Sequence, residues 1–305
     1  MLYHLLYSFS DHSSFFNVFR YITFRVLLAG ITSFSICLLL GPWFIRKMTR
    51  SQIKQFVRDD GPQTHLKKAG TPTMGGGLII VSIAISTLLW ADLSNSFIWM
   101  LLFIMCFFGL IGWLDDWFKI SKKNSKGISG KTKLILQFSG AAIFVLFMVM
   151  FSNIDFTVRF PLFKRLTIDL WYFFLPFAML VLVGASNAVN LTDGLDGLAI
   201  GPVIISTFAF LILSYCAGNY KIAEYLQIPY VKGAGEMAIL CGAMLMAGLG
   251  FLWFNTYPAQ VFMGDVGALS LGGTLGAMAV FTKNEILLVV IGGVFVLEAV
   301  SVMMQ

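Results

Sequence analysis

The sequence predicts an all-α protein, a polytopic bundle of helices that crosses a membrane several times, and two observations support this prediction. The 305 residues are 58% hydrophobic and only 12% charged, with a mean hydropathy of +0.84. An ordinary soluble domain carries about 25% charged residues, so this chain has too little polar surface for a water-soluble globule of its size. The apolar residues also form continuous runs of spanning length rather than the ten-residue alternations of a transmembrane barrel.

Nine apolar runs are candidate spanning helices, and they predict a single transmembrane domain over residues 1–305. The runs cover residues 22–45, 74–91, 97–114, 134–151, 170–186, 198–217, 237–254, 268–282 and 286–305. The first 21 residues are polar and aromatic, so we expect no cleavable signal peptide and a retained first span. The four cysteines lie inside apolar runs without metal-ligand spacing, and we interpret them as small buried apolar residues.

Basic residues predict which side of the membrane each loop faces. Loop 46–73 holds seven and loop 115–133 holds six, whereas the opposite loops (92–96, 152–169, 218–236 and 283–285) hold six in total. Since Lys and Arg accumulate in cytoplasmic loops, the first two loops are placed in the cytoplasm and the N-terminus outside. Loops 187–197 and 255–267 then follow on the cytoplasmic side by alternation. The basic residues are interpreted as orientation charges, which explains the net charge of +6 without nucleic-acid binding.

This alternation gathers seven of the fifteen acidic residues at one membrane face: Asp59, Asp60, Asp115, Asp116, Asp193, Asp196 and Asp265. The strongest local signal is the adjacent pair Asp115 and Asp116, at the inner end of an apolar run where a charge is costly without a partner. Neighbouring residues of a helix point about 100° apart, so we expect one of the two carboxylates to face the bundle and the other to face water.

The segment 187–197 holds a second pair of acids, Asp193 and Asp196, at a spacing that fits one helix face or one turn. Asn190 and the glycines beside them offer amide and backbone donors to a ligand. A plain turn between two spans is the alternative. Eleven residues with two acids and no basic residue favour a functional site.

Segment 254–267 places Asp265 between glycines, just before an apolar run and without a lysine nearby in the sequence. Such an acid suits a hard metal ion that also takes phosphate oxygens. The aromatic residues Tyr257 and Phe262 fit stacking on a base, or a place in the belt at the membrane interface.

Segment 59–77 combines lysines, hydroxyl groups and glycines before a helix start, a combination that favours phosphate. It has no Walker A pattern. Its His65 fits either a structural hydrogen bond or acid–base chemistry. Acids and lysines at one membrane face together predict a divalent cation and a phosphorylated substrate.

Four runs carry a specific resemblance: G-P-Q-T-H-L-K-K-A-G-T-P-T-M-G-G, L-D-D-W, N-L-T-D-G-L-D-G-L-A and F-N-T-Y-P-A-Q-V-F-M-G-D-V-G. In this order they resemble the phospho-N-acetylmuramoyl-pentapeptide-transferases, within the polyprenyl-phosphate N-acetylhexosamine-1-phosphate transferase superfamily, over essentially the whole chain. The resemblance implies transfer of phospho-MurNAc-pentapeptide from UDP-MurNAc-pentapeptide to undecaprenyl phosphate, giving lipid I and UMP in peptidoglycan biosynthesis, with Mg²⁺. It also implies ten spans in the bacterial inner membrane, an active site facing the cytoplasm and a homodimer.

The resemblance also implies roles for individual residues. Asp115 and Asp116 match the acidic pair implicated in binding and deprotonating the lipid phosphate, and Asp265 matches the acid linked to Mg²⁺; these three are the expected catalytic residues. The residues in the loops associated with uridine and diphosphate binding are Lys68, Asn190, Asp193, Asp196, Asn255 and Phe262.

The chain departs from the family pattern in two places. Ala268 stands where Ser is common, and a last cytoplasmic loop with three His and a tenth span do not follow Gln305. We therefore expect a truncated form with poor turnover. The alternatives are a polyprenyl-phosphate N-acetylglucosamine-1-phosphate transferase or a cation transporter, although transporters place such acids near the bilayer midplane.

Overall fold

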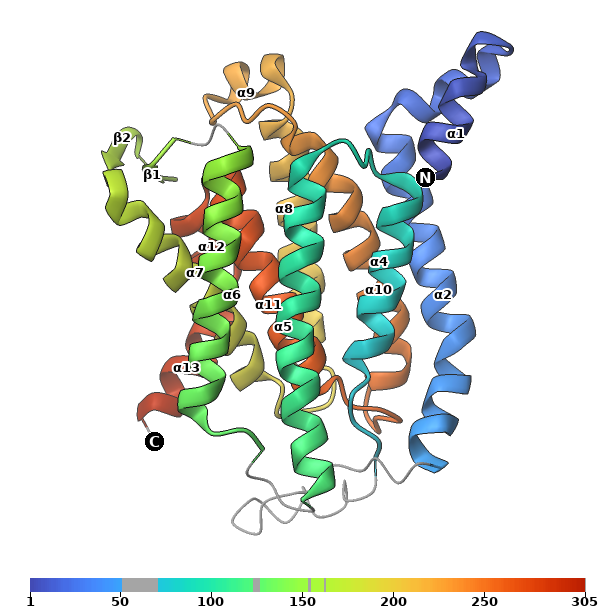
Figure 1. Cartoon of the computed structure of the whole chain (residues 1–305), viewed down its shortest axis with the longest axis vertical. Coiled ribbons are helices and arrows are strands. Elements are labelled where there is room, and N and C mark those ends of the chain that lie inside the picture. The colour runs from blue at the N-terminus through green and yellow to red at the C-terminus, as the bar shows by residue number, and fades with distance from the viewer. Residues whose placement is uncertain (51–70, 123–126, 153–154, 162, 305) are drawn as a thin grey trace.

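The computed structural model describes residues 1–50, 71–122, 127–152, 155–161 and 163–304, and it confirms the predicted helical membrane bundle (Figure 1). Within these ranges seven helices are long and apolar enough to cross a membrane. They are α2 (Ile22–Arg50), α5 (Ser96–Ser121), α6 (Gly130–Phe151), α7 (Phe174–Thr192), α8 (Ile200–Ala217), α10 (Met237–Asn255) and α11 (Gly264–Thr282).

The two remaining predicted runs also form helices, but neither is a straight span of full length. The run at 74–91 becomes α4 (Gly76–Trp90), a helix of 15 residues. The last run divides into α12 (Glu285–Ile291) and α13 (Gly293–Met304), which meet at 80°. The break falls at consecutive glycines, Gly292 and Gly293, where a helix is easily kinked.

Short elements cover one end of the bundle, at the top of Figure 1, and we call it the hairpin end. They include α1 (Leu2–Ser8), η1 (Phe9–Asp11), η2 (Ser14–Arg20), η3 (Trp171–Phe173), α9 (Tyr220–Leu226) and η4 (Ala234–Glu236). The loop predicted at 152–169 contains an antiparallel hairpin of β1 (Thr157–Phe160) and β2 (Phe163–Asp169), in which Val158 pairs with Ile168.

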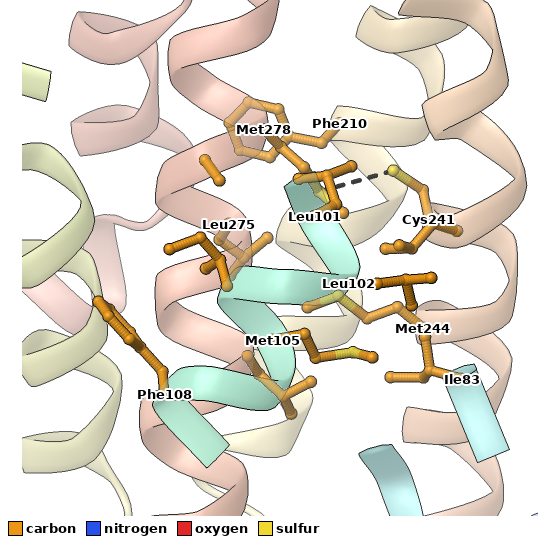
Figure 2. Close-up of a cluster of buried hydrophobic side chains, with 14 of the residues drawn as sticks. Ile83, Leu101, Leu102, Met105, Phe108, Phe210, Cys241, Met244, Leu275 and Met278 are labelled. Atoms are coloured by element: carbon orange, nitrogen blue, oxygen red, sulfur yellow. Dashed lines mark hydrogen bonds between the residues drawn. The ribbon is translucent and has the colours of Figure 1, made fainter. Parts of the chain in front are cut away.

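Helices α10 and α11 form the centre of the bundle. Helix α11 packs against α5 and α7, while α10 packs against α2 and α8. Figure 2 shows side chains of α5, α10 and α11 meeting in the core, where the Cys241 thiol lies 3.6 Å from the Met278 sulfur. Cys241 and Cys37 are buried as predicted, but Cys106 is exposed on the outer surface of α5. All four cysteines are free.

Two glycine contacts bring the start of α11 against its neighbours. A Cβ atom on Gly112 of α5 would lie 2.2 Å from the carbonyl oxygen of Asp265. A Cβ atom on Gly76 of α4 would lie 2.0 Å from the backbone nitrogen of Gly267. Side chains at these positions would push the helices apart, so the glycines allow Asp265 to approach the acids of α5.

Candidate functional site

Three carboxylates converge at the end of the bundle opposite the hairpin end, which we call the acidic end. Asp115 and Asp116 lie on the last turns of α5, and Asp265 lies on the first turn of α11. One oxygen of each carboxylate lies within 4.8 Å of the other two. The prediction that one member of the Asp115–Asp116 pair faces water is wrong, because α11 covers this part of α5 and leaves both residues less than 5% exposed.

Two lysines that the sequence analysis did not assign individually to the site complete this cluster. The Nζ atom of Lys119 lies 2.6 Å from Asp115 Oδ2 and 3.1 Å from Asp265 Oδ2. The Nζ atom of Lys133 lies 2.6 Å from Asp265 Oδ2. Asp265, without a lysine nearby in the sequence, therefore has two in the fold. The i,i+4 spacing of Asp115 and Lys119 is the signal that the sequence offered for the first of these contacts.

The donor set of the cluster fits a divalent metal ion. The Oδ2 atom of Asp116 is buried and has no hydrogen-bond partner in the part of the chain that the structure describes. Asp115 is held in place, because its Oδ1 atom accepts a hydrogen bond of 2.7 Å from the backbone N–H of Ile128. Three carboxylates against two lysines leave a net negative charge, and carboxylate oxygens are the ligands that Mg²⁺ prefers.

Asp193 lies beside this cluster, at the end of α7. Its Oδ2 atom accepts a hydrogen bond of 3.1 Å from the backbone N–H of Gly264, which precedes Asp265. Desolvation raises the pKa of Asp193 well above its ordinary value, and the negative charges of Asp265 and Asp116 raise this pKa further. The fold thus places Asp193 beside Asp265, the predicted metal ligand, although the two residues are 72 positions apart in the sequence (265 minus 193).

Backbone pairing holds Phe262 at the same end of the bundle. The N–H of Phe262 donates to the carbonyl oxygen of Pro72 at 2.9 Å, and the N–H of Gly75 donates back to the carbonyl oxygen of Phe262 at 2.8 Å. The described part of segment 59–77 therefore runs beside segment 254–267, as their shared membrane face predicted. Lys68, the remaining predicted site residue of this segment, lies outside the described residues.

Asn255 and Asp196 join two loops at the acidic end. The buried Asn255 side chain accepts a hydrogen bond from the N–H of Gly197 at 3.1 Å and donates one to the carbonyl oxygen of Val261 at 2.8 Å. Asp196 accepts a hydrogen bond of 3.2 Å from the N–H of Ala259. Asn190 lies half-buried on the last turn of α7. Segment 187–197 is therefore cross-linked to segment 254–267, which holds Phe262.

A buried chain of hydrogen bonds lies one helical turn behind Lys133 and Asp265. Gln137 on α6 accepts a hydrogen bond of 2.8 Å from Asn187 and donates one of 3.4 Å to Ser186, both on α7. The Ser186 hydroxyl donates in turn to the carbonyl oxygen of Leu269 on α11 at 3.0 Å. Gln137 follows Lys133 by four residues, and Leu269 follows Asp265 by four. This polar relay, which the sequence analysis missed, therefore connects the two helices whose side chains meet in the cluster.

Comparisons with known proteins identify close relatives. The profile of glycosyl transferase family 4 matches residues 98–283. Proteins named phospho-N-acetylmuramoyl-pentapeptide-transferase from Citrifermentans bemidjiense and Pelobacter propionicus are 56% and 55% identical to the chain. A protein of the same name from Desulfotalea psychrophila is 55% identical. Each alignment covers 100% of this chain and 85% of the relative.

Proposed function

Since the chain belongs to glycosyl transferase family 4 and, within it, to the phospho-N-acetylmuramoyl-pentapeptide-transferases, it is a transferase of peptidoglycan synthesis, and we propose that the acidic end is its active site. The proposed reaction moves phospho-MurNAc-pentapeptide from UDP-MurNAc-pentapeptide to undecaprenyl phosphate and releases UMP. The observation that carries this proposal is the convergence of Asp115, Asp116 and Asp265 at one end of a membrane bundle.

Asp265, together with Asp116 and Asp115, would hold the Mg²⁺ ion. The support for this role is the close approach of the three carboxylates and the buried Asp116 oxygen without a partner. When bound, the ion would neutralise charge on the phosphates of the nucleotide sugar. Gly112 allows Asp265 to approach α5 this closely, since a side chain at position 112 would meet the Asp265 carbonyl oxygen.

The proposed chemical step is a displacement at phosphorus. An oxygen of the lipid phosphate forms a bond to the phosphorus atom that carries the sugar, while the bond from this atom to the bridging oxygen breaks and UMP leaves with the electron pair. One member of the acidic pair would take a proton from the lipid phosphate. The ammonium groups of Lys119 and Lys133 lie among the carboxylates. From this position they would hold phosphate oxygens of a bound substrate through charge-assisted hydrogen bonds.

The loops around the cluster would bind the nucleotide. We assign Phe262 to stacking on the uracil ring, and the proposed polar contacts are those of Lys68, Asn190, Asp193, Asp196 and Asn255. Backbone pairing of Phe262 with segment 72–75 and the loop contacts of Asn255 support this assignment, since they hold these segments beside the carboxylates.

The chain is a multi-pass membrane protein. The proposed location is the bacterial inner membrane, with the acidic end in the cytoplasm, where a soluble UDP-sugar meets a lipid carrier. The excess of basic residues in the loops at 46–73 and 115–133 supports this orientation. A homodimer and a single transferase domain are parts of the same proposal.

UMP release from purified protein tests the function. We expect release only when Mg²⁺, UDP-MurNAc-pentapeptide and undecaprenyl phosphate are all present. UDP-N-acetylglucosamine in place of this donor distinguishes the proposed activity from that of the related N-acetylglucosamine-1-phosphate transferase. We expect no UMP from UDP-N-acetylglucosamine. Equal release from both donors, or release without the lipid phosphate, would contradict the proposal.

A further inference from the structure

A polar cavity lies at the hairpin end, far from the acidic cluster. It encloses about 510 Å³ between the start of α5, the end of α6, the β1–β2 hairpin and the segment that joins α9 to η4. In Figure 1 these elements surround the top of the bundle, whereas the ends of α5 and α11 that carry the acidic cluster lie at the bottom. The cavity therefore has no residue in common with the proposed active site.

The charges that line this cavity are mostly positive. Among the described residues, its basic lining residues are Arg159 from β1, Lys232 and Lys283, and its acidic lining residue is Asp155. Asp155 is already engaged, because its carboxylate lies 3.3 Å from Lys283 Nζ and its backbone oxygen accepts a hydrogen bond from the same ammonium group. The charges of Arg159 and Lys232 are therefore left without an acid among the lining residues.

Lys283 fixes the floor of the cavity. Its side chain is only 2% exposed, and its Nζ atom lies 4.0 Å from the centre of the Phe174 ring. Burial lowers the pKa of Lys283, the carboxylates of Glu285 and Asp155 raise this pKa, and the positive charge of Arg159 lowers it. Arg159 and Lys283 line the same cavity, so an anion held between them would offset the unfavourable effect of one positive charge on the other.

Arg159 also has an unused hydrogen-bond donor. Its Nε atom is buried and has no partner among the described residues. A guanidinium group presents its donors in a planar fork that matches phosphate, and a buried donor without a partner carries a free-energy penalty. Asn95 and Tyr230 line the same cavity and add a side-chain amide and a hydroxyl group.

We infer that the cavity at the hairpin end is a binding site for a phosphate-bearing ligand, held by Arg159 and Lys232 above the Lys283–Asp155 pair. Two sources supply this chemistry. One is the head group of an anionic lipid in the leaflet at the hairpin end, and the other is a soluble phosphate ester in the water on the same side. The cavity is large enough for the organic group of either ligand as well as for the phosphate.

Protection of an introduced thiol tests this inference without relying on turnover. Ser94 lines the cavity and is exposed, so Ser94→Cys should react with a polyethylene-glycol maleimide in vesicles of phosphatidylcholine. Glycerol phosphate tests the soluble source, with chloride at equal ionic strength as the reference. Vesicles that contain phosphatidylglycerol test the lipid source. A ligand at twice its Kd should slow labelling about threefold.

Matched variants decide between specific binding and a general charge effect. Arg159→Gln combined with Lys232→Gln should remove the protection, whereas Lys221→Gln, on α9 outside the cavity, should retain it. Tyr225→Cys, at a site 85% exposed on the same helix, should show no protection by either ligand. An unchanged unfolding temperature shows that the double variant is folded. No protection from either source, or equal protection in the double variant, would overturn the inference.

Discussion

The acidic end shows how burial changes the behaviour of single side chains. Asp193 receives a hydrogen bond from Gly264, but desolvation and two neighbouring carboxylates make its charged form costly. A group of this kind reduces the stability of the folded protein at neutral pH. A destabilising group of this kind fits a role in ligand binding, where stability is commonly lost in exchange for function.

Asp193→Asn tests this interpretation through the pH dependence of stability. The folded protein holds the Asp193 proton at pH values where the unfolded chain has lost it, so stability should fall as the pH rises from the ordinary aspartate range through the raised pKa. The amide oxygen of Asn can still accept the Gly264 hydrogen bond. We expect the variant to unfold at a higher temperature than the parent at pH 8, to match it in acid, and to release UMP more slowly. A lower unfolding temperature at pH 8 would contradict the charge argument.

At the same scale, the sequence predicted the carboxylates of the site better than their surroundings. Asp115, Asp116 and Asp265 were expected at one face, because loop alternation gathers them, and the structure brings them within 4.8 Å. Lys133 was not assigned to the site, since its contact with Asp265 depends on how α6 packs beside α11. The burial of both paired acids likewise depends on the helix that covers them.

At the scale of elements, the polar relay sets the distance between α6 and α11. Gln137, Asn187 and Ser186 are polar groups inside an apolar bundle, where a lost partner costs about 1–3 kcal/mol. The relay lies one turn behind the contact between Lys133 and Asp265. We therefore expect the relay to position these side chains.

Gln137→Met tests the relay as a positioning device. The change keeps the side-chain length but removes both hydrogen bonds, so Lys133 should lose its fixed place beside Asp265. We expect kcat to fall about tenfold, equivalent to about 1.4 kcal/mol, while the KM for the UDP-sugar changes little. Ser139→Ala on the same helix is the control, since the Ser139 hydroxyl donates a hydrogen bond to the carbonyl oxygen of Leu136 in its own helix. A purely structural role would instead lower the unfolding temperature and leave kcat per folded molecule unchanged.

The helices themselves were predictable because each apolar run is longer than the apolar stretches of a loop, and all nine runs are helical in the structure. The 80° bend between α12 and α13 was not predicted, since the Gly292–Gly293 pair resembles the Gly272–Gly273 pair that packs inside the unbroken helix α11. The hairpin was also missed. Its strands of four and seven residues are too short to show in a search for spanning runs.

At the scale of the whole molecule, the two ends of the bundle differ in chemistry. The acidic end gathers carboxylates, lysines and glycine-rich loops, whereas the hairpin end holds short elements and the partly buried pair Arg25–Glu236, with a contact of 2.6 Å. The acidic end is the one that we propose for the transferase reaction, and the proposal places it in the cytoplasm.

Sided labelling tests this orientation. Lys131 is exposed at the acidic end and Tyr225 is exposed at the hairpin end. In intact cells an impermeant maleimide should label Tyr225→Cys but not Lys131→Cys, and opened membranes should label both. The parent protein gives the background from native thiols. Labelling of Lys131→Cys in intact cells would reverse the orientation.

The most direct test of the proposed active site is UMP release by Asp265→Asn across a Mg²⁺ titration. The substitution is nearly isosteric, so folding should survive while a formal charge at the three-carboxylate cluster is lost. We expect kcat to fall at least about 100-fold, equivalent to about 2.7 kcal/mol, with the Mg²⁺ midpoint moved to higher concentration. Asp92→Asn, at the hairpin end, should remain close to the parent. Near-normal turnover of Asp265→Asn with an unchanged Mg²⁺ midpoint would show that the metal is held elsewhere.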